Sequence, residues 1–181
     1  MKKIDLRSDT VTLPPQPMKD FMFNAPLGDD VYGEDPSINL LETKASVLFG
    51  KQSAVFVPSG TMANLISVLS HCNRGEEMLL GDKSHIFKYE AGGSSVFGGI
   101  HSHQLPNNDD GTIDINHITQ GIQDDDEHHA VTRLLCLENT HNLCYGTAMK
   151  AQYFQNVKKE IKPFNIKLHI DGARIFNAAI A

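Results

Sequence analysis

Lys167-Leu168-His169-Ile170-Asp171-Gly172-Ala173-Arg174 is the stretch of the 181-residue chain that says most about its fold. Leu168 and Ile170 alternate with polar residues, which predicts a short buried strand that ends in the carboxylate of Asp171. Gly172 lets the backbone turn, and Arg174 follows three residues after Asp171. In open α/β sheets, ligands bind beyond the carboxyl ends of the strands. An Asp and an Arg placed there suit a ligand with one cationic and one anionic group, or form a purely structural pair.

Strand-like and helix-like segments alternate over most of the chain before this stretch. The expected strands are 54–57, 78–81, 100–105 and 131–137, and the expected helices are 61–71, one from about 86, 114–122 and 150–162. Strands that alternate with helices form βαβ units, whose strands are parallel. The sequence therefore predicts an α/β fold with a mostly parallel sheet and helices on both faces.

The N-terminal part of the chain follows another pattern. Three prolines in residues 8–17 predict an extended arm, and a short helix is expected over 18–24. Residues 26–36 form a polar loop with glycines, of the kind that is either solvated surface or a functional loop. The next helix is expected from Ser37, as its N-cap, to Gly50.

These patterns divide the chain into two parts. Residues 1–53 are expected to form an N-terminal arm, a loop and a first helix, and residues 54–181 a partial α/β domain. The helix that begins at Ile175 has apolar residues with little to cover them. The chain therefore resembles a truncated piece of a longer fold.

Composition limits the classes of function. The net charge is −6, whereas a nucleic-acid surface would be basic, and there is no run of about 18 apolar residues that could cross a membrane. No apolar segment of a signal peptide follows the N-terminal lysines. The three cysteines lack a CxxC spacing and fit free thiols in a reducing compartment. We therefore expect a cytoplasmic protein without a nucleic-acid or membrane partner.

Ser59-Gly60-Thr61 lies between a predicted strand and a predicted helix. Backbone N–H groups and the positive end of the helix dipole can hold a phosphate at such a turn, and Thr61 could add a hydroxyl group. A simple helix cap explains the same residues. The GxxxxGK spacing of a P-loop is absent. The turn is a candidate phosphate site, with helix capping as the alternative.

Polar residues also flank other predicted strands. His85 follows the second predicted strand. It is either a surface residue or a ring that stacks on a flat ligand. Residues 138–142 follow the predicted strand 131–137. They form either a hydrogen-bonded turn or part of the crevice at the carboxyl ends of the strands. His128 precedes that strand and would lie at the opposite edge of the sheet unless its loop folds back. No HxxxH or HExxH spacing supports a metal site, so none is predicted.

Several motifs occur together in order along the chain. They are DLRSDTVT (5–12), GDDVYGEDP (28–36), SGTMAN (59–64), EAGG (90–93), ENTHN (138–142) and HIDGAR (169–174). As a set they resemble the motifs of the low-specificity L-threonine aldolases, in the β-eliminating lyase group of fold-type-I pyridoxal-phosphate enzymes. The resemblance implies the large domain of the pyridoxal-phosphate-dependent transferase-like fold. It also implies cleavage of L-threonine or L-allo-threonine to glycine and acetaldehyde.

The resemblance gives cofactor roles to particular residues. Gly60 and Thr61 correspond to the family's grip on the phosphate of pyridoxal 5'-phosphate. His85 corresponds to a histidine that stacks on the pyridine ring and touches the substrate hydroxyl. Asp171 corresponds to the partner of the ring nitrogen, and Arg174 to a contact with the ring oxygen. The cofactor expected from the resemblance is therefore pyridoxal phosphate, with no metal.

Other roles concern a small β-hydroxy amino acid substrate. Ser8 corresponds to a ligand of the substrate carboxylate, and Tyr32 lies on a loop that in the family reaches a neighbouring subunit's site. His128 matches a second histidine near the substrate hydroxyl in some members. The resemblance thus implies a homo-oligomer, a dimer or a tetramer, whose sites are shared between subunits.

Two features depart from the family pattern. Residues 143–149 differ from the family's glycine- and proline-bearing segment. The family's Schiff-base lysine follows the Asp-Gly-Ala-Arg motif on a Ser-Lys-Gly turn, and this chain ends before it. The 181-residue chain alone is therefore expected to be inactive. The alternatives are a fragment that at most binds the cofactor or associates as an oligomer, and a related β-eliminating lyase that acts on another amino acid.

Overall fold

The computed structural model describes residues 4–181. It divides into two compact units, one up to Phe56 and one from Val57 to Ala181. The second unit is an α/β structure with a parallel sheet, so the predicted fold class is confirmed. The assignment of 1–53 as an arm and of 54–181 as a cofactor-binding domain stays a prediction. None of the helices in the described chain has the length and apolarity that crossing a membrane requires.

The sheet of the second unit has four parallel strands in the order β2-β1-β3-β4. They are β1 (Glu77–Gly81), β2 (His101–Leu105), β3 (Thr132–Glu138) and β4 (Lys167–Asp171). Because the strands are parallel, their carboxyl ends meet at one edge of the sheet. At that edge the last residue of β3, Glu138, pairs in register with the last residue of β4, Asp171.

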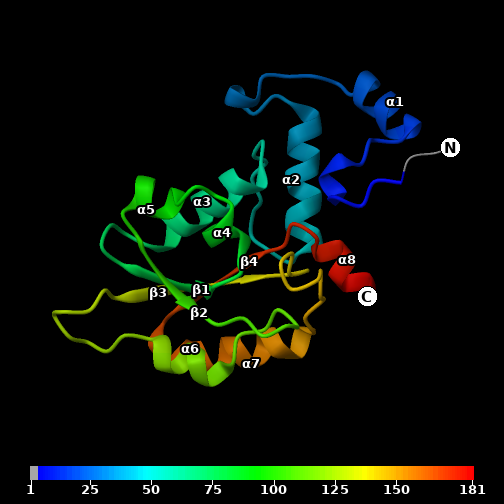
Figure 1. The fold of residues 1–181 in the computed structure, drawn as a ribbon. Helices are drawn as coiled ribbons and strands as arrows, with labels where there is room; N and C mark the ends of the chain where they lie inside the picture. Colours follow the sequence, from blue (N-terminus) through cyan, green and yellow to red (C-terminus); the bar gives the residue numbers. More distant parts are fainter. Residues whose placement is uncertain (1–3) are drawn as a thin grey trace. The chain divides into compact units, whose positions relative to one another are not determined.

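Helices cover both faces of this sheet (Figure 1). On one face lie α3 (Gly60–His71), α4 (His85–Lys88) and α5 (Gly93–Gly98). On the other face lie α6 (Ile115–Gly121) and α7 (Ala151–Ile161), the latter followed by the 3-10 helix η3 (Lys162–Phe164). α8 (Ile175–Ile180) follows β4. The arrangement confirms the predicted helices on both faces.

The alternation of side chains along the strands produces two cores. Met78 and Leu80 of β1 are fully buried on the face that carries α3, together with Val68 of that helix. Leu79 points to the other face, where it packs in one cluster with Val157 of α7. The two central strands, β1 and β3, therefore contribute to both cores, as expected for a sheet covered on both faces.

The first unit consists of helices and loops. Its elements are η1 (Asp9–Val11), α1 (Gln16–Asn24), η2 (Asp30–Tyr32) and α2 (Pro36–Leu48). The Asp35 carboxylate accepts hydrogen bonds from the backbone N–H groups of Ser37 and Ile38, at 2.9 and 3.0 Å, and these bonds lower its pKa. The N-cap of α2 is therefore Asp35, and the prediction of Ser37 is wrong. Pro36 begins the helix, where its missing N–H costs nothing.

Three further predictions differ from the structure. Ala54–Val57 is not a strand, because an isolated extended segment needs a hydrogen-bonded neighbour and no strand of the described sheet pairs with it. The helix expected from about residue 86 is split into α4 and α5, since Gly92 adopts a left-handed conformation with a φ of 66°. Ile170 is 39% exposed and not buried, because β4 is an edge strand of the described sheet.

Candidate functional site

Polar side chains from several elements meet at the carboxyl edge of the sheet. Asp171 ends β4, Glu138 ends β3, and His85 begins α4 after the turn that follows β1. The backbone N–H of His85 donates to Glu138 Oε2 at 2.7 Å, and that of Asn142 donates to Glu138 Oε1 at 2.8 Å. The buried Glu138 carboxylate therefore holds the start of α4 and the turn after β3 at the same edge.

Asn64 of α3 bridges two carboxylates at this edge. Its Nδ2 lies 2.8 Å from Glu90 Oε1 and 2.8 Å from Asp171 Oδ2. Its Oδ1 lies 2.9 Å from Nε2 of His169. Burial lowers the pKa of His169, an effect that the charge of Asp171 opposes. All hydrogen-bonding atoms of the Asn64 side chain thus have partners in the site.

The ring of His85 lies against an acidic partner. Its Nδ1 is 2.9 Å from Glu90 Oε1, and its ring centroid is 5.5 Å from that of Tyr89. Glu90 is buried, whereas the His85 side chain is 36% exposed. The ring is therefore anchored on one side by a buried carboxylate and accessible on another.

His141 follows Glu138 in the turn after β3 and is 1% exposed. Neither of its ring nitrogens has a hydrogen-bond partner in the described chain, and the same is true of the buried hydroxyl of Thr147. Burial lowers the pKa of His141, and the nearby Glu138 carboxylate opposes this effect. Burial therefore favours the neutral form of the His141 ring.

The N-terminus of α3 faces open space. Ser59 is the N-cap, and its hydroxyl accepts from the backbone N–H of Met62 at 3.1 Å, so Thr61 is not needed as the cap. A Cβ atom built on Gly60 would meet no atom within 4 Å. Gly60 and Thr61 are both exposed. Their position leaves room for an anion at the positive end of the helix.

Other predicted site residues lie elsewhere. Arg174 is half-buried at the start of α8, three residues after Asp171. His128 lies in the loop before β3, at the opposite edge of the sheet, where its Nδ1 is 2.7 Å from Asp126 Oδ1. The described unit therefore does not bring His128 to His85, and its role stays a prediction.

Ser8 and Tyr32 belong to the first unit, so their predicted roles also remain untested. The Ser8 hydroxyl accepts from the backbone N–H of Thr10 at 3.2 Å and caps η1. Tyr32 ends η2 and is 77% exposed. Both side chains are accessible within their own unit, which is a requirement for contact with a ligand or another subunit.

The resemblance assigns no role to Glu90 or Asn64, which build the site together with His85 and Asp171. The Glu90, Asp171 and His85 side chains each offer a ligand atom within 4.8 Å of the others, a separation that a metal ion could use. His85 and Glu90 are five residues apart, but Asp171 lies far along the chain, so no short spacing signals the whole cluster. Asn64 hydrogen-bonds to two of the three, so a polar network accounts for their proximity without a metal.

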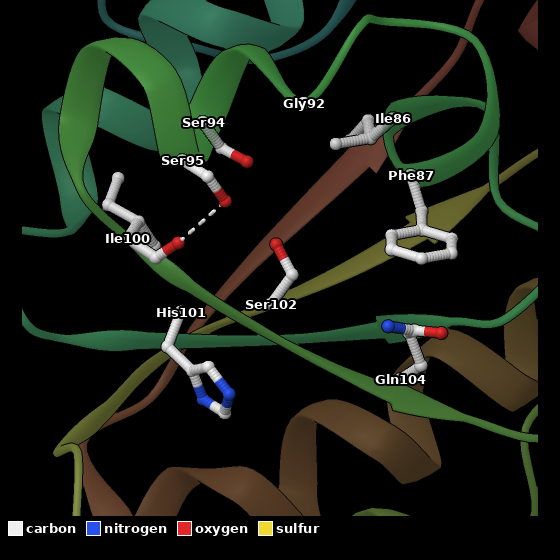
Figure 2. Close-up of a pocket in the computed structure, with 9 residues that line it drawn as sticks. All are labelled: Ile86, Phe87, Gly92, Ser94, Ser95, Ile100, His101, Ser102 and Gln104. Atoms are coloured by element: carbon white, nitrogen blue, oxygen red, sulfur yellow. Dashed lines mark hydrogen bonds between the residues drawn. The ribbon is translucent and has the colours of Figure 1, made fainter.

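A separate cavity of about 300 Å³ lies beside α4, α5 and β2 (Figure 2). Its lining includes Phe87, Ser94, Ser102 and Gln104, and the hydroxyl of Ser95, which donates to the backbone carbonyl of Ile100 at 3.2 Å. Among the described residues that line it there is no carboxylate, and the Nδ1 of the lining residue His101 is already paired with Glu77 Oε2 at 2.8 Å. Acid–base chemistry is therefore better placed at the carboxyl edge of the sheet than in this cavity.

A family model and several known proteins match this chain. The family model described as Beta-eliminating lyase matches residues 5–181. The chain is 48% identical to low-specificity L-threonine aldolase 1 of Arabidopsis thaliana, covering 100% of this chain and 51% of that protein. It is 47% identical to the low specificity L-threonine aldolase of Escherichia coli, covering 98% of this chain and 53% of that protein. The chain thus spans about half the length of the curated relatives it matches.

Solved structures show the same fold. The threonine aldolase of Leishmania major superposes with a TM-score of 0.61 and 25% identity, over 66% of this chain and 34% of that one. A candidate L-allo-threonine aldolase of Listeria monocytogenes superposes with a TM-score of 0.69 and 24% identity, over 87% of this chain and 43% of that one. The fold of the described chain is therefore that of a part of these proteins.

Proposed function

The chain belongs to the Beta-eliminating lyase family, and from this premise we propose that the full-length protein cleaves L-threonine or L-allo-threonine to glycine and acetaldehyde. Enzymes of this family depend on pyridoxal phosphate. The observation that carries the proposal is the cluster of Asp171, Glu90 and His85 at the carboxyl edge of the sheet, the edge at which α/β proteins bind ligands. A cytoplasmic location and a dimer or tetramer with shared sites belong to the same proposal.

The residues at this edge fit the cofactor. Asp171 Oδ2 accepts from Asn64 and Oδ1 accepts from the backbone N–H of Ala173 at 3.1 Å, which leaves lone pairs for a further donor such as a protonated ring nitrogen. The open N-terminus of α3 at Gly60 and Thr61 suits a phosphate group. Pyridoxal phosphate, when bound, supplies an electron sink that lets the Cα–Cβ bond of a β-hydroxy amino acid break.

The remaining roles fall to side chains of this chain. Asp171 would keep the ring nitrogen protonated, and Arg174 would contact the ring oxygen. The exposed side of His85 would take the proton of the substrate hydroxyl as a general base. Ser8 would bind the substrate carboxylate, His128 would act near the substrate hydroxyl, and Tyr32 would reach the site of a neighbouring subunit.

The test is a cleavage assay on the full-length protein with pyridoxal phosphate. We expect L-threonine to yield acetaldehyde and glycine in equal amounts, measured by a coupled reduction of acetaldehyde and by chromatography. Replacing His85 by Phe keeps an aromatic ring but removes the base, so we expect kcat to fall about 100- to 10,000-fold. His117→Phe, at an exposed position on α6, is the matched control and should keep its activity.

A wild-type protein that leaves both threonine isomers intact would contradict the proposal. Consumption of another amino acid by β-elimination, with threonine unchanged, would favour the related lyase instead. The two results are separated by running both substrates on the same preparation.

A further inference from the structure

Asn64 and Glu90 connect the two side chains on which the proposed function depends. We infer that both are positioning residues of this site: Asn64 fixes the carboxylates of Glu90 and Asp171, and Glu90 holds His85 with its proton on Nδ1. The expected effect of these residues on catalysis rests on the proposed function. The orientation of the Asn64 amide and the position of the proton on the His85 ring do not depend on a bound cofactor.

The orientation of the Asn64 amide follows from its partners. Carboxylates only accept hydrogen bonds, and the atom of Asn64 that lies 2.8 Å from both Glu90 and Asp171 must therefore be the donor nitrogen. Its two N–H groups are used once each. In the flipped orientation, the carbonyl oxygen would face two carboxylates in a position that is only 5% exposed. A buried unpaired acceptor of this kind is costly, which fixes the amide.

The same reasoning extends to His169. Asn64 Oδ1 accepts, so Nε2 of His169 at 2.9 Å must carry a proton. Burial lowers the pKa of His169, so the ring is neutral and this proton is a single, directed donor. The hydrogen bonds therefore run in one direction, from His169 to Asn64 and from Asn64 to the two carboxylates.

Glu90 determines which nitrogen of His85 carries the proton. Its Oε1 accepts a hydrogen bond from Asn64 Nδ2 and lies 2.9 Å from His85 Nδ1. Because a carboxylate only accepts hydrogen bonds, His85 Nδ1 must be the donor and carry the proton. In a neutral ring, Nε2 then has a free lone pair. That is the form a general base requires. Glu90 thus acts on the proposed reaction through the His85 ring.

The first test measures the tautomer of His85 by ¹⁵N NMR on the apo full-length protein labelled at histidine. The His85→Gln variant identifies the signal. We expect the pattern of an Nδ1-protonated ring in the wild type and a loss of that preference in Glu90→Leu. An Nε2-protonated His85 in the wild type would overturn the inference, even where Glu90→Leu fails to fold.

The second test separates positioning from folding by kinetics. In Glu90→Leu we expect kcat to fall about 10- to 100-fold, a part of what a positioned base contributes, while KM and the dissociation constant of pyridoxal phosphate change less than about threefold. Glu90→Gln retains a carbonyl acceptor for Nδ1–H and should restore part of kcat. Glu76→Gln changes a carboxylate at the other edge of the sheet and should behave as wild type.

Asn64→Leu also removes the hydrogen bond from Asn64 Nδ2 to Asp171 Oδ2. For this variant we expect weaker cofactor binding, by about tenfold, together with the lower kcat. Ser67→Ala, one turn further along α3, is the matched control. Unchanged kcat in Glu90→Leu, or unchanged cofactor affinity in Asn64→Leu, would overturn the inference. If the wild type neither binds the cofactor nor cleaves threonine, the proposed function fails, whereas the NMR result still decides the inference.

Discussion

His141 is a single residue whose burial has a measurable consequence. Burial lowers its pKa below the ordinary 6.5, so on acidification the unfolded chain takes up a proton before the folded chain does. The free energy of unfolding should therefore fall as the pH drops below about 6.5. His141→Phe removes this contribution and should flatten the pH dependence by up to about 1.4 kcal/mol per pH unit, measured by urea denaturation between about pH 7.5 and pH 5.

Thr147→Val provides the control for this prediction. This substitution removes a buried hydroxyl that has no hydrogen-bond partner among the described residues, and it removes no titratable group. It should therefore change the free energy of unfolding by the same amount at every pH. His169, whose pKa burial also lowers, leaves some pH dependence in both variants. A slope in His141→Phe equal to that of wild type would show that His141 is protonated equally in both states.

The predictability of the site differs from residue to residue. The sequence places Asp171 and His85 at the ends of predicted strands, and the parallel order of the strands brings both to one edge. It could not pair Asn64 with Asp171, 107 residues apart, or with Glu90, 26 residues apart. Such contacts depend on how far α3 extends over the sheet, which no local pattern encodes.

Tyr153 joins two elements through one hydroxyl group. On α7, its Oη accepts from the backbone N–H of Ile113 and donates to the carbonyl of the same residue, both at 2.8 Å. Burial raises the pKa of Tyr153 to about 12. Tyr153→Phe leaves both backbone groups of the buried Ile113 unpaired, so we expect the free energy of unfolding to fall by about 1–3 kcal/mol.

Tyr145→Phe is the matched control, because that side chain is 87% exposed. Its effect in the same urea denaturation should stay within about 0.5 kcal/mol. Equal stability of Tyr153→Phe and wild type would mean that water replaces the hydroxyl, and that α7 does not depend on this contact.

Elements were predictable where their own sequence determines them. The apolar run of β3 and the periodic pattern of α7 gave segments whose ends agree with the structure within a residue or two. Ala54–Val57 has the composition of a strand but no partner in the described sheet, and a strand exists only through pairing. The sequence predicts Pro36 as the end of a loop, whereas it is the first residue of α2 and the preceding Asp35 is the cap.

The whole molecule consists of two units with different content. The second contains the sheet and the cluster around Asp171, whereas Ser8 and Tyr32 lie in the first. The roles proposed for Ser8 and Tyr32 therefore concern residues outside the unit that contains this cluster. Cofactor binding through Asp171 is the part of the proposal that one unit can explain by itself.

Titration of the full-length apo protein with pyridoxal phosphate, followed by absorbance, tests this central claim most directly. We expect saturable binding of one cofactor per chain in the wild type. Asp171→Ala should raise the dissociation constant at least about tenfold, equivalent to about 1.4 kcal/mol, whereas Asp125→Ala, at an exposed position, should bind as wild type does. Absence of saturable binding in the wild type, or equal affinity in Asp171→Ala, would contradict the account.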